Sequence, residues 1–375
     1  MSIESIMEGV DEQMGKPMSR RGYLGGSSLG KECPRQLWLD WRWCNAPLAD
    51  ARLARIFALG HQLEDNIAEF IRKSPKVRLI THERGEQIGG SFFGGHLRYH
   101  IDGLLTGPDG KTYLWECKTA NNRRFNRLNK LGTQAREAGE TKNLAYSEWD
   151  ETYSMQVHFY GGALKEQYPE ENINGAYITV YDKNTSAIYS EQMDLDEIIY
   201  NQLKDKAWWL LNLKEPPQAA YSKSAFQVKN FMDDEERGIY LGELTPLNPL
   251  CRTCKFSRPN LSDKQKRGQW GCTRTKTIIN HKQQLKGCLD HEWIPGLVPA
   301  KHLGNNKYEK NDVVFYNVGA SNPMTEEHSY TSSEIAYLCR NDFNFEDNDK
   351  ITDARKLFDV KQQLEVTKND NNNED

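Results

Sequence analysis

The sequence lacks any run of about 18 apolar residues, the length that a helix needs to cross the apolar core of a membrane. Its mean hydropathy is low, at -0.79. Residues 1–20 are polar and charged, and they have no apolar stretch of the kind that a secretory signal peptide requires. We therefore expect a protein without a membrane segment that stays in the cytoplasm.

An excess of one charge sign is also missing, because 49 Lys and Arg residues nearly balance 53 Asp and Glu residues and leave a formal net charge of -4. This balance argues against a protein that coats nucleic acid with its whole surface, so the local distribution of positive charge matters more than the total. Cysteine is not abundant, at 8 of 375 residues. In a cytoplasmic chain of this length, cysteines are better explained as metal ligands or core residues than as disulfide partners.

The most informative stretch of the chain contains two segments of strand-forming residues. They run from Leu97 to Leu105 and from Lys111 to Thr119, and the turn sequence Gly107-Pro108-Asp109-Gly110 lies between them. We predict that these segments form an antiparallel hairpin centred on Asp109.

In a hairpin with that centre, Asp102 is opposite Glu116 and His100 is opposite Lys118, and the four side chains share one face because strand side chains alternate. Opposed Cβ atoms are roughly 5 Å apart, so two bare carboxylates would repel each other there. Their neighbours are apolar, and buried Asp or Glu is rare unless it is paired or metal-bound. The spacing therefore predicts a site for a hard divalent cation, Mg²⁺ or Mn²⁺, and the alternative is a solvated charged face.

Asp102, followed after thirteen residues by Glu116-Cys117-Lys118, resembles the signature of the PD-(D/E)XK nuclease superfamily. The resemblance implies metal-dependent hydrolysis of DNA, in which an activated water attacks phosphorus and leaves a 5′-phosphate and a 3′-hydroxyl. It implies that Asp102, Glu116 and the Cys117 carbonyl hold the metal and that Lys118 positions the water.

A helix is predicted over residues 48–73, where apolar residues recur at the spacing of a helix face. It contains the string Gly60-His61-Gln62-Leu63-Glu64. In the RecB and lambda-exonuclease branches of the superfamily, an acidic or histidine metal ligand lies four residues after such a glycine. The resemblance therefore implies that Glu64 is a metal ligand, with His61 as the competing candidate because residues three apart share a helix face.

The segment after Lys118 is basic, and Arg123, Arg124 and Arg127 leave the end of the predicted strand near the metal site. Such arginines are suited to contacts with DNA phosphates, and a solvated loop is the alternative. These three arginines are therefore candidate DNA contacts.

A second helix is predicted from Glu151 to Leu164, and Gln156 and Tyr160 share one of its faces because they are four residues apart. The same Gln-x-x-x-Tyr pair follows the catalytic strand in RecB-like nucleases, so the resemblance implies that both residues support the active site. Segments 176–181 and 187–193 are predicted to form a further hairpin that completes the sheet.

Four cysteines, Cys251, Cys254, Cys272 and Cys288, lie within 38 residues, and the first two form a C-x2-C pair. Such a pair with two further cysteines can close a tetrahedral zinc site. The sequence Cys33-Pro-Arg is similar to the opening of RecB-like nucleases, and that resemblance implies instead that Cys33 joins three of the later cysteines around a 4Fe-4S cluster. Both possibilities, structural Zn²⁺ and an iron-sulfur cluster, stay open at this point.

Positive charge is concentrated in the same segment. Between Cys251 and Cys288 there are ten Lys or Arg residues and one acidic residue. We expect this segment to bind the DNA backbone, with Lys264, Lys266 and Arg267 as candidate contacts, and a solvated basic loop is the alternative.

Together these features predict an α/β restriction-endonuclease-like core, made of a helix, a three-stranded antiparallel sheet, a second helix and further strands. The predicted divisions are an N-terminal extension (1–20), the nuclease core (21–245), a basic cysteine module (246–295), a small α+β appendage (296–365) and a disordered acidic tail (366–375).

The function that the resemblance implies is a Mg²⁺- or Mn²⁺-dependent deoxyribonuclease, first of all an exonuclease of DNA recombination, repair or replication. A phage exonuclease would fit this description, and it would act in the host cytoplasm with a recombination or replication protein as its partner. The alternatives are a structure-specific endonuclease, which shares every site residue, and a non-catalytic DNA-binding accessory protein.

Overall fold

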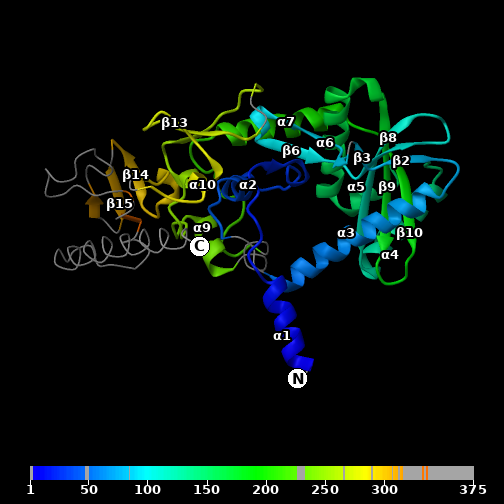
Figure 1. Cartoon of the computed structure of the whole chain (residues 1–375), viewed down its shortest axis with the longest axis horizontal. Coiled ribbons are helices and arrows are strands. Elements are labelled where there is room, and N and C mark those ends of the chain that lie inside the picture. The colour runs from blue at the N-terminus through cyan, green and yellow to red at the C-terminus, as the bar shows by residue number, and fades with distance from the viewer. Residues whose placement is uncertain are drawn as a thin grey trace. The chain divides into compact units, whose positions relative to one another are not determined.

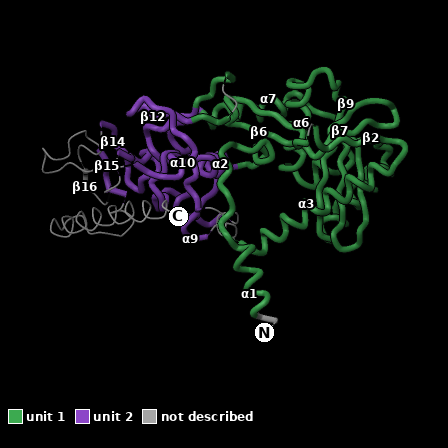
Figure 2. Tube along the Cα trace, viewed as in Figure 1, with its two compact units in different colours: residues 1–32, 47–211, 260–269 green, residues 33–46, 212–259, 270–375 purple. Residues whose placement is uncertain are grey.

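The computed structural model describes residues 3–46, 50–83, 85–225, 233–264, 267–288, 290–305, 307–310, 313–315, 332 and 335–336. The chain divides into two compact units, each assembled from segments that are distant in sequence (Figure 2). Unit 1 contains residues 1–32, 47–211 and 260–269, and unit 2 contains residues 33–46, 212–259 and 270–375. Lys266, the predicted tail and most of the predicted appendage lie outside the described residues. Within the described part of the chain, no helix is both long and apolar enough to span a membrane.

Unit 1 is built on a five-stranded sheet, of which Figure 1 labels β2, β8, β9 and β10. The strand order is β10-β9-β8-β7-β2. In that order the strands are β10 (Ile188–Met193), β9 (Ile173–Asp182), β8 (Thr112–Ala120), β7 (Gly103–Thr106) and β2 (Arg78–Ile80). Neighbours are antiparallel except β8 and β9, which are parallel. The sheet is therefore mixed, and β8 is its central strand.

The predicted hairpin forms between β7 and β8, and its register is the predicted one, because Gly103 pairs with Trp115 and Leu104 pairs with Leu114. Its turn has Gly110 in the left-handed region, at φ +77°, where glycine is the residue without steric cost. The predicted hairpin of residues 176–193 also forms, as β9 and β10.

The first strand of the predicted hairpin is not continuous. The chain leaves the ladder at Ile101 and Asp102, and the preceding strand β6 (Leu97–His100) belongs to a second sheet. In this sheet β6 lies between β1 (Leu24–Gly25) and β5 (Gly89–Phe92). In that sheet His100 pairs with Gly89. The expected pairings of Asp102 with Glu116 and of His100 with Lys118 are therefore wrong, because two different sheets divide the segment between them.

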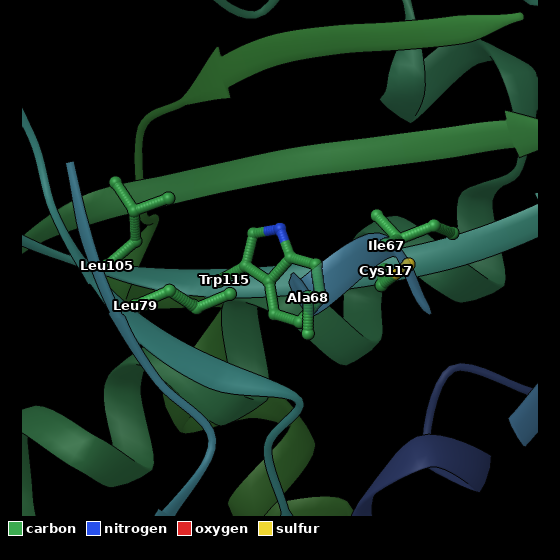
Figure 3. Close-up of a cluster of buried hydrophobic side chains, with 6 residues drawn as sticks. All are labelled: Ile67, Ala68, Leu79, Leu105, Trp115 and Cys117. Atoms are coloured by element: carbon green, nitrogen blue, oxygen red, sulfur yellow. The ribbon is translucent and has the colours of Figure 1, made fainter. Parts of the chain in front are cut away.

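Helix α3 (Ala51–Arg72) packs on one face of the sheet through residues from both elements: Ile67, Ala68, Leu79, Leu105, Trp115 and Cys117 (Figure 3). The Trp115 indole Nε1 donates to Thr179 Oγ1 at 3.0 Å, so this buried ring has its polar atom satisfied. Because side chains alternate along β8, Glu116 and Lys118 point away from this cluster.

Two helices face the side of the sheet to which Glu116 points, α4 (Asn122–Glu137) and α6 (Glu151–Gln167). Gln156 of α6 reaches Glu116, and Tyr189 of β10 lies against Gly132 of α4, where a Cβ would come within 2.3 Å of the Tyr189 hydroxyl oxygen. Helix α6 begins at the predicted Glu151, and the Asp150 carboxylate caps it by accepting from Tyr153 N–H.

Unit 2 contains α2 (Pro34–Trp41), α9 (Asp234–Leu241) and α10 (His281–Gln284), with one antiparallel sheet of β11 (Ser257–Pro259), β12 (Trp270–Cys272) and β13 (Thr277–Ile279). A second antiparallel sheet contains β14 (Lys301–Gly304), β15 (Lys307–Lys310) and β16 (Val313–Phe315).

Buried arginines stack on tryptophans in the core of unit 2. The guanidinium of Arg42 lies 4.9 Å from the Trp270 ring centre, and that of Arg252 lies 3.8 Å from the Trp43 ring centre. Arg42 also donates to the Arg252 carbonyl oxygen at 3.1 Å. These cation–π contacts and hydrogen bonds compensate the cost of burying two charges.

Candidate active site

The candidate active site lies where β8 extends past its neighbour β7. The β7–β8 ladder begins at the pair Gly103–Trp115, whereas β8 continues to Ala120 and stays paired with β9 on its other side. The edge of β8 from Glu116 onward is therefore left open on the β7 side, and Asp102 occupies the beginning of that opening. Its Oδ2 accepts the backbone N–H of Cys117 at 2.8 Å.

Glu116 is fully buried and is held by two side chains. Its Oε1 accepts from Gln156 Nε2 at 2.7 Å and lies 2.5 Å from Lys118 Nζ. Its Oε2 is also buried, and it has no hydrogen-bond partner among the described residues. A buried carboxylate oxygen without a partner is costly, and it is the natural place for a cation to bind.

The electrostatics of the site are those of crowded carboxylates. Burial, together with the neighbouring Asp102, raises the pKa of Glu116 to about 8 and that of Glu64 to about 7. Burial also raises the pKa of Asp102, although Lys118 and the Cys117 N–H oppose that shift. Three neighbouring carboxyl groups with raised pKa values indicate that the site has too little positive charge to balance them.

Lys118 is the exception to this pattern. Burial opposes its charged form, but the Glu116 and Asp102 carboxylates outweigh burial and raise its pKa well above the ordinary value. Its ammonium group also lies 5.1 Å from the ring centre of Tyr153. Lys118 is therefore a permanent cation in the site.

A cavity of about 870 Å³ opens onto these residues. Six of the predicted site residues border it: His61, Glu64, Asp102, Lys118, Gln156 and Tyr160. Glu116 lies behind Lys118 and Gln156 and is not itself exposed. The Cys117 side chain points to the α3 cluster, so only its backbone faces the site. Residues predicted from four separate segments thus meet at one cavity.

Two arginines that the sequence analysis missed border the same cavity, Arg21 and Arg98. Arg98 is in β6 and lies 5.0 Å from the ring centre of Tyr23, and its Nε donates to the Gly95 carbonyl oxygen. Neither arginine belongs to a motif. Only the joining of β1 to β6 as parallel neighbours brings these segments together.

As they stand, the described His, Cys, Asp and Glu side chains form no group of three that closes around a metal ion. The donor set nevertheless fits one, because it offers carboxylate oxygens, excess negative charge and the unpartnered Glu116 Oε2. Hard divalent cations take such oxygen ligands and complete their shell with water and substrate oxygens. Glu64 and Asp102 are half-buried and border the same cavity in front of Glu116.

The three candidate DNA-binding arginines after Lys118 lie on α4, not on a loop. Arg124 forms an ion pair with Asp150 at 2.6 Å, and Arg127 donates to the Glu148 carbonyl oxygen. Arg123 is exposed on the same helix. None of these three arginines is among the described residues that border the cavity.

The predicted DNA-binding residues Lys264 and Arg267 are exposed and lie in the segment 260–269, which belongs to unit 1 although it connects β11 and β12. Gly268 N–H donates to the Gly94 carbonyl oxygen at 2.9 Å, and His96 Nε2 lies 2.9 Å from the Gln269 carbonyl oxygen. The segment therefore packs against residues 94–96, which directly precede β6, the strand that carries Arg98.

The five candidate cysteine ligands separate into two locations within unit 2. Cys251, Cys254, Cys272 and Cys288 all border one cavity of about 590 Å³. Cys33 is buried elsewhere, with its Sγ 3.1 Å from the Tyr240 hydroxyl oxygen, and it is not among the described residues that border that cavity.

Comparison with known proteins gives a coarse likeness. No family model matches the chain, and no curated protein matches it. The solved structure of the protein SSO0001 has 14% identity and a TM-score of 0.29, over 55% of this chain and 86% of that one.

Two further solved structures are of an alkaline exonuclease from Laribacter hongkongensis, LHK-Exo. One has 16% identity and a TM-score of 0.30, over 53% of this chain and 90% of that one. The other, in complex with dAMP, has 14% identity and a TM-score of 0.33, over 51% of this chain and 87% of that one. TM-scores this low say nothing about function, which must be inferred from the site residues.

Proposed function

We propose that this protein is a divalent-metal-dependent nuclease that hydrolyses DNA phosphodiester bonds. The observation that carries the proposal is the buried Glu116 carboxylate, with Oε2 unpartnered among the described residues and Oε1 2.5 Å from Lys118 Nζ. A carboxylate that needs a cation, beside a lysine that stays charged, is an arrangement suited to phosphoryl transfer, where negative charge develops on phosphate oxygens.

In this proposal Mg²⁺ or Mn²⁺ is held by Asp102, Glu116 and Glu64, with the Cys117 carbonyl as a further ligand. All are oxygen donors, which these ions prefer. His61 is exposed at the margin of the cavity and is the alternative to Glu64. When bound, the cation would lower the pKa of a coordinated water and neutralise charge on the phosphate.

The remaining roles fall to the chain's own side chains. Lys118 stabilises the charge that develops on the phosphoryl oxygens and orients the attacking water. Gln156 holds Glu116 in place through its 2.7 Å hydrogen bond. Burial raises the pKa of Tyr160, so its hydroxyl keeps its proton and can donate to a phosphate in the cavity. Arg21 and Arg98 supply positive charge for the DNA backbone at the same cavity.

Within this class we propose an exonuclease of recombination, repair or replication, in keeping with the RecB-like residue pattern. A structure-specific endonuclease would use the same residues. The two activities are therefore distinguished by which DNA substrate is cleaved. The test is incubation of end-labelled linear DNA and closed circular DNA with Mg²⁺ or Mn²⁺. Linear DNA should be degraded and circular DNA should stay intact, and EDTA should stop the reaction.

A Lys118→Ala preparation, purified in the same way, controls for contaminating nucleases. Cleavage of the closed circle would replace the exonuclease by an endonuclease. If both DNAs stay intact with either metal, the nuclease proposal is wrong and the protein is a DNA-binding accessory or something else.

Salt dependence tests the proposed DNA-binding residues of segment 260–269. Log affinity falls as log salt concentration rises, and each Lys or Arg that neutralises a phosphate makes this slope steeper by about 0.9. Replacing Lys264, Lys266 and Arg267 with glutamine should therefore lower the slope by about 3 and weaken binding roughly a hundredfold at physiological salt. Fluorescence anisotropy over a salt series, with EDTA present to prevent cleavage, measures both quantities.

The matched control replaces three exposed lysines near the far end of β8 or at the end of α6, Lys76, Lys111 and Lys165, with glutamine. The net charge changes equally in the two triple variants. Equal slopes for them would show that segment 260–269 does not contact the DNA backbone.

A further inference from the structure

The cysteine cavity of unit 2 is assembled by local structure. The single turn at Cys251–Thr253 places Cys251 and Cys254 side by side, with Cys254 N–H donating to the Cys251 carbonyl oxygen at 3.1 Å. The β11–β12 register pairs Ser257 with Cys272, so Cys272 arrives next to the turn. Cys288 follows α10, and its neighbour Lys286 accepts a 3.5 Å contact from Cys251 Sγ through its carbonyl oxygen.

Cys33 lies outside this cysteine cavity. Its side chain is 1% exposed, and its Sγ is engaged with the Tyr240 hydroxyl group. Cys288, in contrast, is exposed and borders the cavity. The ligand set that includes Cys33 and omits Cys288 therefore has the less suitable geometry of the two.

We propose that Cys251, Cys254, Cys272 and Cys288 bind one Zn²⁺ ion as a tetrathiolate site, and that Cys33 takes no part in it. Zinc is four-coordinate and tetrahedral with thiolate ligands. Four cysteines within residues 251–288 meet that requirement without a ligand from a distant segment. Since the described cysteines do not yet meet at one point, their side chains must rotate toward the cavity when the ion binds.

The site would stabilise a part of the chain that has little other regular structure. β11, β12 and β13 are three residues long each, and α10 has four residues. Strands of this length bury little apolar surface, so metal binding supplies much of the folding free energy in such modules. Chelation of zinc should therefore make residues 251–288 sensitive to proteases.

The test measures metal content in the full-length protein purified without oxygen, together with its visible absorption. Wild type and the matched control Cys33→Ser should contain about one zinc per chain and be colourless, because Zn²⁺ is a d¹⁰ ion. Cys288→Ser should lose most of its zinc. Iron with brown colour, lost in Cys33→Ser and kept in Cys288→Ser, would overturn the proposal in favour of a cluster.

Cysteine alkylation of the wild type gives a second measurement that needs no variant. With metal bound, Cys251, Cys254, Cys272 and Cys288 should resist alkylation, and a chelator should make them reactive together. If Cys288, which is exposed, reacts equally fast before and after chelation, it is not a ligand and the proposal is wrong. Neither measurement involves DNA, so the nuclease proposal is tested separately.

Discussion

Replacing Lys118 with alanine is expected to lower the rate of DNA hydrolysis by about 10²–10³-fold while the affinity for DNA changes little. The lysine is the permanent cation beside Glu116, and its charge is proposed to act on oxygens that become more negative in the transition state. DNA binding in the ground state depends mainly on residues that contact other phosphates. Single-turnover cleavage and anisotropy in EDTA separate the two effects.

The alanine variant also leaves the buried Glu116 without its ion-pair partner, which destabilises a protein by about 3–5 kcal/mol when no other group compensates. Lys118→Gln is therefore the second variant, because its amide can still donate to Glu116 Oε1 while the positive charge is gone. Thermal unfolding distinguishes lost folding from lost catalysis. If Lys118→Gln folds and cleaves within tenfold of wild type, Lys118 does not act in the chemical step.

Replacing Asp102 with asparagine is expected to abolish metal-dependent stabilisation and cleavage without destabilising the metal-free protein. Asparagine keeps an oxygen that can accept the Cys117 N–H, now received by Asp102 Oδ2 at 2.8 Å. It removes a charge that raises the pKa of both Glu116 and Glu64. The same substitution also removes the attraction between Asp102 and the Lys118 ammonium group, so the two effects oppose each other. The Tm of the metal-free protein should therefore change by no more than about 4 °C at pH 8.

The pH dependence follows from the same carboxylates. Their folded-state pKa values, about 8 for Glu116 and about 7 for Glu64, lie above those of unfolded glutamate. The stability that these protonated groups contribute is therefore fully present below the pKa that they have in the unfolded chain. It is lost as the pH rises through the pKa that they have in the folded protein. The metal-free protein should become less stable between about pH 5 and pH 8.

Mg²⁺ should reverse this trend, because the metal binds the deprotonated carboxylates. Below pH 7, the apparent affinity of the protein for Mg²⁺ should fall about tenfold per pH unit for each proton that the metal displaces. Scanning calorimetry of wild type and Asp102→Asn from pH 5 to pH 9, with and without Mg²⁺, measures all of these effects. A Mg²⁺-induced Tm increase that Asp102→Asn retains would remove Asp102 from the metal site.

The sequence by itself determined those features that depend on neighbouring residues. The turn around Asp109 specified the β7–β8 register, since a loop of given centre and length allows one set of pairs. Apolar spacing located α3 to within a few residues of its observed limits, and α6 begins at the predicted Glu151. Motif spacing also selected Glu64 and Gln156, which border one cavity although they lie on different helices.

Only the tertiary structure decided which strands pair with one another. Strand alternation predicted one continuous strand through His100 and Asp102, but β6 finds its partners in β1 and β5, so the chain changes sheets there. Alternation specifies which face a side chain takes and contains no information about which distant strand supplies the hydrogen bonds.

The same reason explains the residues that were missed or misplaced. Arg21 and Arg98 reach the cavity because β1 and β6 lie side by side, and no local pattern marks either one. Cys288 was a candidate ligand from its spacing and Cys33 from the resemblance to RecB-like nucleases. Cys33 is buried against Tyr240, whereas Cys288 borders the cysteine cavity. Spacing counts residues along the chain, whereas ligation depends on where folding brings the sulfur atoms.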